Sequence, residues 1–131
     1  MDYKELIQKA VKAKEASVSP YSNFRVGSTL LTEGENIYTA CNVVNSTFGL
    51  TLCAERNAIF KAMSEGERKF KTIVIASDSP DYISPCGACR QIIYDHCGEI
   101  DIICTNNKGE YKIFKTSELL PFAFGDKDLN K

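Results

Sequence analysis

The chain has 131 residues, of which 44% are hydrophobic and 25% are charged, and these values are typical of one globular domain with a buried core. Its 16 Lys and Arg residues nearly balance 17 Asp and Glu residues, giving a net charge of −1. This balance argues against a protein that binds the phosphate backbone of a nucleic acid polymer. No stretch approaches the roughly 20 apolar residues that cross a membrane. We therefore expect a single domain over residues 1–131 that acts on a small ligand.

The cysteines give the first functional indication. Residues 1–5 lack the apolar core of a secretory signal peptide, so we expect a cytoplasmic protein. In such a reducing compartment, clustered thiols more often bind metal or take part in chemistry than form disulfides. The six cysteines stand at positions 41, 53, 86, 89, 97 and 104.

The first half of the chain predicts one helix and a hairpin. Apolar residues at helical spacing, preceded by Asp2 as an N-cap, predict a helix over residues 3–16. Alternating residues predict strands over 25–32 and 37–42, joined by a turn at 33–36. Residues 43–52 show no period and are expected to form a loop.

The second half alternates helices and buried strands. Helical spacing over 53–63 and 86–96 is followed in each case by an apolar, β-branched run, at 72–76 and 100–104. A last strand is expected over 111–114. Strands separated by a helix predict parallel neighbours in one sheet, with helices on its faces. The expected fold is a three-layer α/β/α domain with a mixed five-stranded sheet.

Three cysteines and a carboxylate occur where two predicted helices begin. Cys53 and Glu55 start one helix, and Cys86 and Cys89 share one face of the other. A helix N-terminus carries partial positive charge, which lowers the pKa of a thiol and favours the thiolate that binds metal. Three thiolates would leave the fourth position of a zinc ion open to water, as catalytic zinc sites do.

Two neighbours of Cys53 have candidate roles beside such an ion. Glu55 lies about 200° around a regular helix from Cys53, but side chains in a first turn lean back toward the N-terminus. Glu55 is therefore expected to reach the open position as a general acid and base, without binding the metal. Three thiolates around Zn²⁺ give a net negative charge, which makes the water on the metal less acidic. Arg56 is expected to donate a hydrogen bond to a thiolate sulfur and so make that water more acidic again. The alternative is that Arg56 forms an ordinary surface ion pair.

These motifs resemble the small, homotetrameric, zinc-dependent cytidine deaminases, in the form where cysteine replaces a histidine ligand. The resemblance covers nearly the whole chain, in the segments 20–27, 41–43, 53–56, 84–91 and 119–124. It implies hydrolytic deamination of cytidine and deoxycytidine to uridine and deoxyuridine plus ammonia, in pyrimidine salvage. It also implies one Zn²⁺ per chain on Cys53, Cys86 and Cys89, with Glu55 moving protons between water, the base nitrogen N3 and the leaving amine.

The resemblance also implies how a nucleoside is held. The backbone N–H of Ala54 would meet the base carbonyl, and the carbonyl of Ser84 would accept the exocyclic amino group. Phe24 would pack on the base, and Asn42 would bind the 3′-hydroxyl of the ribose.

Two further phenylalanines, Phe48 and Phe124, match aromatic positions that related enzymes present to a neighbouring subunit's site. The site would then be complete only in a homotetramer. The alternative is that both side chains belong to the core of the monomer.

One position departs from the family pattern. The family usually places a glutamate two residues after the asparagine, where it makes a second contact to the sugar, and this chain has Val44 there. Losing a hydrogen bond to a charged group costs roughly 1.5–3 kcal/mol, or about 10- to 150-fold in binding. Weaker cytidine binding, compensation by Asn45, and a substrate with an altered sugar, such as the antibiotic blasticidin S, all stay open.

Three other functions for the cysteines fit the sequence less well. A structural zinc module would need a fourth ligand, but His96 and Cys97 lie about 15 Å along the helix from Cys86. The remaining candidates, Cys41 and Cys104, belong to predicted strands. A redox pair of Cys86 and Cys89 leaves Cys53 and Glu55 unexplained, and a polynucleotide deaminase would need more basic surface.

Overall fold

A computed structural model describes residues 2–20, 24–46, 51–125 and 129. None of the helices in these ranges is long and apolar enough to span a membrane. The elements in chain order are α1 (Tyr3–Lys14), β1 (Val26–Thr32), β2 (Ile37–Cys41), α2 (Ala54–Ser64), β3 (Phe70–Ser77), α3 (Gly87–Cys97), β4 (Asp101–Thr105), β5 (Tyr111–Lys115) and α4 (Thr116–Leu119).

The five strands form one mixed sheet, as predicted, and their order in it is β2-β1-β3-β4-β5. Only β3 and β4 pair in parallel, while the other neighbours are antiparallel. The expectation that helix-separated strands are parallel neighbours is therefore right for β3 and β4 and wrong for β2 and β3. Both β2 and β3 pair with β1 from opposite sides, so they run in the same direction without touching.

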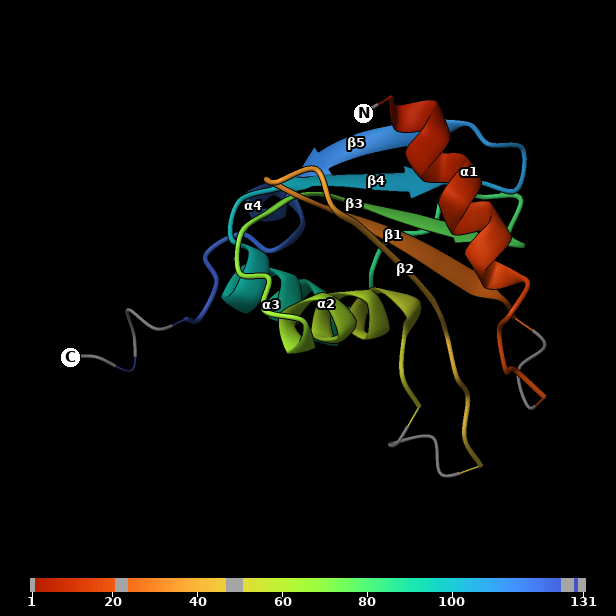
Figure 1. The fold of residues 1–131 in the computed structure, drawn as a ribbon, viewed down its shortest axis with the longest axis horizontal. Coiled ribbons are helices and arrows are strands. Elements are labelled where there is room, and N and C mark those ends of the chain that lie inside the picture. The colour runs from red at the N-terminus through yellow and green to blue at the C-terminus, as the bar shows by residue number, and fades with distance from the viewer. Residues whose placement is uncertain (1, 21–23, 47–50, 126–128, 130–131) are drawn as a thin grey trace.

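Helices cover both faces of the sheet, which confirms the three-layer arrangement. Figure 1 shows α1 on one face and α2 and α3 on the other. Side chains along a strand alternate between faces, so Ile73 and Ile75 of β3 join the core beneath α2 and α3, whereas Val74 and Ala76 join the core beneath α1. The central strands are buried on both sides.

A glycine sets the distance between α1 and β1. A Cβ atom at Gly27 would lie 2.0 Å from the backbone oxygen of Ala10 and 2.6 Å from the backbone nitrogen of Lys14. No side chain fits there. The close approach holds the C-terminal half of α1 against β1, the strand that begins two residues after Phe24.

The helix ends differ from the prediction in ways that matter for the site. Both α2 and α3 begin one residue later than predicted, so Cys53 and Cys86 are N-cap residues with extended backbone. Asp2 caps α1 as expected, accepting a hydrogen bond from the backbone N–H of Lys4. The helix ends at Lys14 rather than residue 16, and α4 was not predicted because a single turn has no measurable period.

Candidate metal centre and nucleoside pocket

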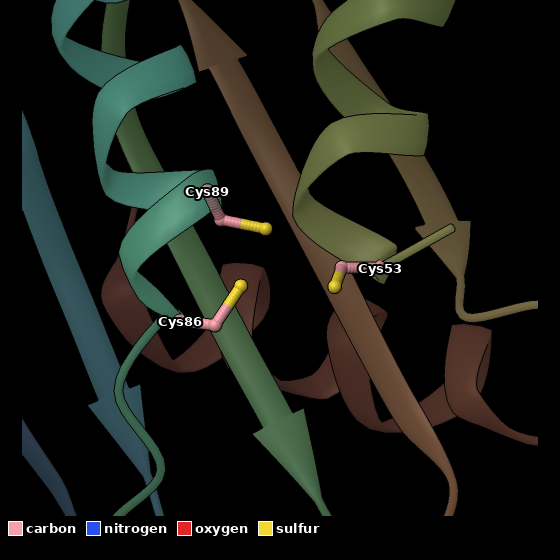
Figure 2. A group of neighbouring side chains, drawn as sticks. All are labelled: Cys53, Cys86 and Cys89. Atoms are coloured by element: carbon pink, nitrogen blue, oxygen red, sulfur yellow. The ribbon is translucent and has the colours of Figure 1, made fainter. Parts of the chain in front are cut away.

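The first turns of α2 and α3 bring three thiols together. The sulfur atoms of Cys53, Cys86 and Cys89 all lie within 4.8 Å of one another. In Figure 2 they point toward a common centre from the two helix ends. No other His, Cys, Asp or Glu in the described ranges joins this group. Since Zn–S bonds are about 2.3 Å long, three sulfurs at this spacing need only small shifts to share one ion. The donor set therefore fits a thiolate-preferring ion with one position left open.

Charge around these thiols favours at least one thiolate. Cys53 accepts hydrogen bonds from the Cys89 thiol and from Arg56, whose Nη2 atom lies 3.5 Å from the Cys53 sulfur, and both lower the pKa of Cys53. The same contact with Cys53, together with burial, raises the pKa of Cys89. Within the described part of the chain, Arg56 therefore contacts a cysteine and forms no ion pair with an acidic side chain. A metal ion on this cluster would displace the remaining protons.

Glu55 lies beside the thiols but outside their cluster. Its side chain is only 4% exposed, and this burial raises the pKa of the carboxyl to about 7. A carboxyl with this pKa exists in both protonation states near neutral pH, so it can accept a proton and return it. The backward lean of first-turn side chains brings Glu55 to the same cavity as Cys53, despite the unfavourable helical angle.

A cavity of about 220 Å³ opens next to the thiols. Phe24, Asn42, Ala54 and Ser84, four of the six residues predicted to contact a nucleoside, line it together with Glu55. Phe48 lies outside the described residues. Phe124 does not line this cavity, and its side chain is 58% exposed near the C-terminus. The other lining residues are Val26, Thr51, Cys53, Ile83 and Cys86.

Asn42 has a structural role that the sequence did not indicate. Its side-chain oxygen accepts hydrogen bonds from the backbone N–H of Val26, at 2.9 Å, and from the hydroxyl of Ser17. Its amide nitrogen donates to the backbone oxygen of Phe24 at 2.8 Å. The asparagine thus fixes the segment that carries Phe24. With its oxygen occupied, only an amide N–H is available for a ligand hydroxyl.

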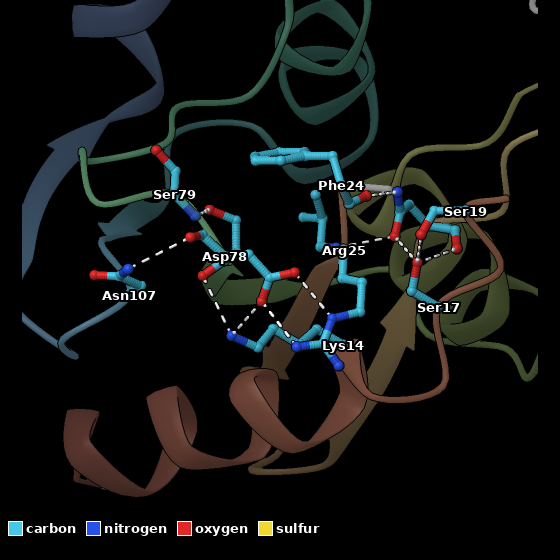
Figure 3. A network of polar contacts seen from close by, with 11 residues as sticks. Lys14, Ser17, Ser19, Phe24, Arg25, Asp78, Ser79 and Asn107 are labelled. Atoms are coloured by element: carbon cyan, nitrogen blue, oxygen red, sulfur yellow. Dashed lines mark hydrogen bonds and ion pairs between the residues drawn. The ribbon is translucent and has the colours of Figure 1, made fainter. Parts of the chain in front are cut away.

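An ionic cluster supports the same wall of the cavity. Two guanidinium nitrogens of Arg25, next to Phe24, lie 2.9 and 3.0 Å from the carboxylate of Asp78, at the end of β3. The ammonium group of Lys14 lies 3.0 Å from that carboxylate, from the α1 side (Figure 3). These cations lower the pKa of Asp78 to about 2. Asp78 lies 53 positions after Arg25 in the chain, so no local pattern indicates the cluster.

Arg90 in α3 is a second residue without a predicted role. Its guanidinium donates to the backbone oxygen of Pro85 at 2.8 Å and to the hydroxyl of Ser84 at 3.0 Å. It also donates to the backbone oxygen of Leu119 at 2.9 Å. Arg90 lies within the 84–91 motif, but its partners are visible only in the folded chain.

Three comparisons with known proteins agree with this geometry. Residues 1–104 match the profile of a family described as the cytidine and deoxycytidylate deaminase zinc-binding region. A cytidine deaminase from Sporosarcina psychrophila is 45% identical over 131 residues, covering 99% of this chain and 96% of that protein. The crystal structure of cytidine deaminase from Burkholderia pseudomallei superimposes with a TM-score of 0.92 at 38% identity, covering 95% of this chain and all of that one. A blasticidin-S deaminase from Bacillus cereus is a more distant relative, 33% identical over 109 residues and covering 76% of each chain.

Proposed function

This chain belongs to the cytidine and deoxycytidylate deaminase zinc-binding family, and from that membership we propose that it hydrolyses cytidine and deoxycytidine to uridine and deoxyuridine, releasing ammonia. The observation that carries the proposal is a cavity lined by Cys53, Cys86 and the buried Glu55, next to the cluster of three thiols and large enough for one small ligand. We propose that the whole of residues 1–131 forms one catalytic domain.

We propose that Cys53, Cys86 and Cys89 would hold a zinc ion, which when bound would supply a water acidic enough to act as nucleophile at neutral pH. The Glu55 carboxylate would accept one proton from the attacking water and pass it to N3 of the base. It would then take the second proton from the new hydroxyl on C4 and pass it to the exocyclic amine as the C4–N bond breaks, so that one water is consumed and one ammonia is released. The raised pKa of Glu55 suits both transfers, because neither protonation state is strongly favoured near pH 7.

The pocket residues are proposed to orient the base and the sugar. The backbone N–H of Ala54 donates to the base carbonyl, and the backbone carbonyl of Ser84 accepts the amino group, so the polar edge of the base stays paired after it leaves water. Phe24 packs against the ring. Asn42 donates its remaining N–H to the 3′-hydroxyl, which agrees with the internal use of its oxygen atom.

Self-association into a homotetramer is proposed to complete the site. Phe124 follows α4, and its side chain is 58% exposed when the described residues alone are considered. We propose that Phe124, together with Phe48, reaches the site of a neighbouring subunit. A role in pyrimidine salvage in the cytoplasm, without a nucleic acid polymer or a membrane as partner, follows from the proposed substrates and the balanced charge.

A second candidate substrate class is cytosine nucleosides with an altered sugar, such as blasticidin S. The observation that favours it is Val44, which is 8% exposed and cannot accept a hydrogen bond from a ribose hydroxyl.

One experiment tests both candidates. The kcat/KM values for cytidine, deoxycytidine and blasticidin S are measured by ultraviolet absorbance, and zinc is measured in the same sample. We expect about one zinc per chain and a preference for cytidine and deoxycytidine. A strong preference for blasticidin S would replace the first candidate by the second, and zinc-free protein with full activity would refute the metal assignment.

A further inference from the structure

The loop before α3 lacks the usual means of being held at a helix start. Cys86 is the N-cap residue, but its side chain makes no capping hydrogen bond. Pro85 has no backbone N–H to donate. At the other end of the loop, the backbone N–H of Ile83 donates to the backbone oxygen of Thr105 at 3.1 Å. Another group must therefore fix the backbone between Ile83 and Cys86.

Arg90 is that group. It lies one turn into α3, and its guanidinium returns to the loop with two nitrogens, on the oxygen of Pro85 and the hydroxyl of Ser84. Its backbone N–H also donates to the oxygen of Cys86 at 2.9 Å. A planar guanidinium with several donors holds two acceptors in a fixed relation, which a lysine ammonium does not do. Ser84 and Cys86 both line the cavity.

The third hydrogen bond of the Arg90 guanidinium is made to the C-terminal segment, residues 119–125, and not to the loop. The guanidinium donates to the oxygen of Leu119, and the next residue, Gln91, donates from its side chain to the oxygen of Phe124 at 2.9 Å. Two consecutive residues of α3, Arg90 and Gln91, therefore hold both the loop beside the thiols and the segment that carries Phe124. A shift of either segment changes the geometry available to the other.

We infer that Arg90 is a positioning residue that sets the substrate-facing geometry of Ser84 and couples it to the C-terminal segment. This rests on the proposed function, because the contact between the Ser84 carbonyl and the substrate amino group belongs to it. Among the described residues, the guanidinium donates to no sulfur atom of the three clustered cysteines, and Arg90 does not line the cavity. Its loss weakens substrate binding more than turnover.

The test compares Arg90→Ala and Arg90→Lys with the unaltered protein. Arg68→Ala is the matched control, because the Arg68 guanidinium also clamps two backbone oxygens, of Met63 and Glu67, at 2.8 and 2.7 Å. Since hydrogen bonds to a charged group are worth about 10-fold or more each, we expect Arg90→Ala to raise KM for cytidine about 10-fold or more. We expect kcat to stay within about threefold of the unaltered value, with zinc near one per chain, an intermediate KM for Arg90→Lys and no change for Arg68→Ala.

Hydrogen–deuterium exchange gives a readout that does not depend on the substrate. Arg90→Ala is expected to accelerate exchange in residues 83–89 and in residues 119–125. An unchanged KM, a parallel loss of zinc and kcat without a change in KM, or faster exchange confined to one of the two segments would overturn the inference. If the unaltered protein does not deaminate cytidine, the proposed function fails, while the exchange measurement still decides whether Arg90 holds the two segments together.

Discussion

Replacing Asp78 by asparagine tests the ionic cluster beside the Phe24 wall. Arg25 and Lys14 lower the pKa of Asp78 from 3.8 to about 2. Since a tenfold change in an equilibrium constant corresponds to about 1.4 kcal/mol, this lowering sets an upper bound of about 2.5 kcal/mol on the stabilisation. The side chains of Arg25 and Asp78 are 45% and 32% exposed, so solvent screening reduces the expected value to about 1–2 kcal/mol.

The lowered pKa of Asp78 also predicts how the stability difference changes with pH. A carboxyl with a lowered pKa in the folded state stabilises the protein above its unfolded pKa, and this contribution is lost as the pH falls through the folded value. In urea unfolding, Asp78→Asn should therefore be less stable than the unaltered protein by about 1–2 kcal/mol at pH 7, and the difference should shrink between pH 4 and pH 2. Asp81→Asn, a change at an exposed carboxylate on the same loop, is the control. Equal stability at pH 7, or a difference that persists unchanged at pH 2, would refute the reasoning.

The remaining predictions concern the site and its support. Glu55→Gln should keep zinc and fold but lower kcat by about 100-fold or more, because the amide cannot carry a proton; near-normal turnover measured by ultraviolet absorbance would remove Glu55 from its role. Arg56→Gln removes the donor to Cys53 and should move the pH–rate profile to higher pH, whereas an unchanged profile would leave Arg56 a structural residue. Val44→Glu should lower KM for cytidine about 10-fold by restoring an acceptor for the sugar, and a KM that stays the same in a folded variant would argue that the position does not meet the ribose. Gly27→Ala should lower the melting temperature by several degrees, because the new methyl group would lie 2.0 Å from the Ala10 oxygen; a melting temperature equal to that of the unaltered protein would show that α1 moves away at little cost.

The sequence predicts the elements whose pattern is local. The β-branched run at 72–76 and the apolar spacing of residues 53–63 each indicate one element, and both elements are present with ends shifted by one or two residues. The order of the strands is less accessible, because the insertion of β1 between β2 and β3 depends on pairing between distant segments. Residues 43–52 were expected to be irregular, yet Val43 forms isolated β-bridges with both Val18 and Leu52. No alternation of apolar and polar residues in the sequence indicates these bridges.

In the candidate site too, the residues with a local sequence pattern could be predicted and those that act through distant contacts could not. Cys53, Cys86 and Cys89 occur at recognisable positions near helix starts, so the cluster could be predicted before its geometry was seen. The residues that fix the pocket walls could not. Asp78 and Arg90 act through backbone oxygens or through partners far along the chain, and contacts of this kind leave no spacing in the sequence.

The position of the three thiols has a consequence beyond chemistry. Cys86 and Cys89 lie at the start of α3 and Cys53 lies at the start of α2, and a long stretch of chain that includes β3 separates these two helix starts. An ion bound to all three sulfurs therefore acts as a cross-link that ties the ends of that stretch together. Removal of the ion by a chelator should therefore lower the melting temperature as well as the rate of deamination. A loss of activity in chelator would then reflect both the missing ion and a less stable fold.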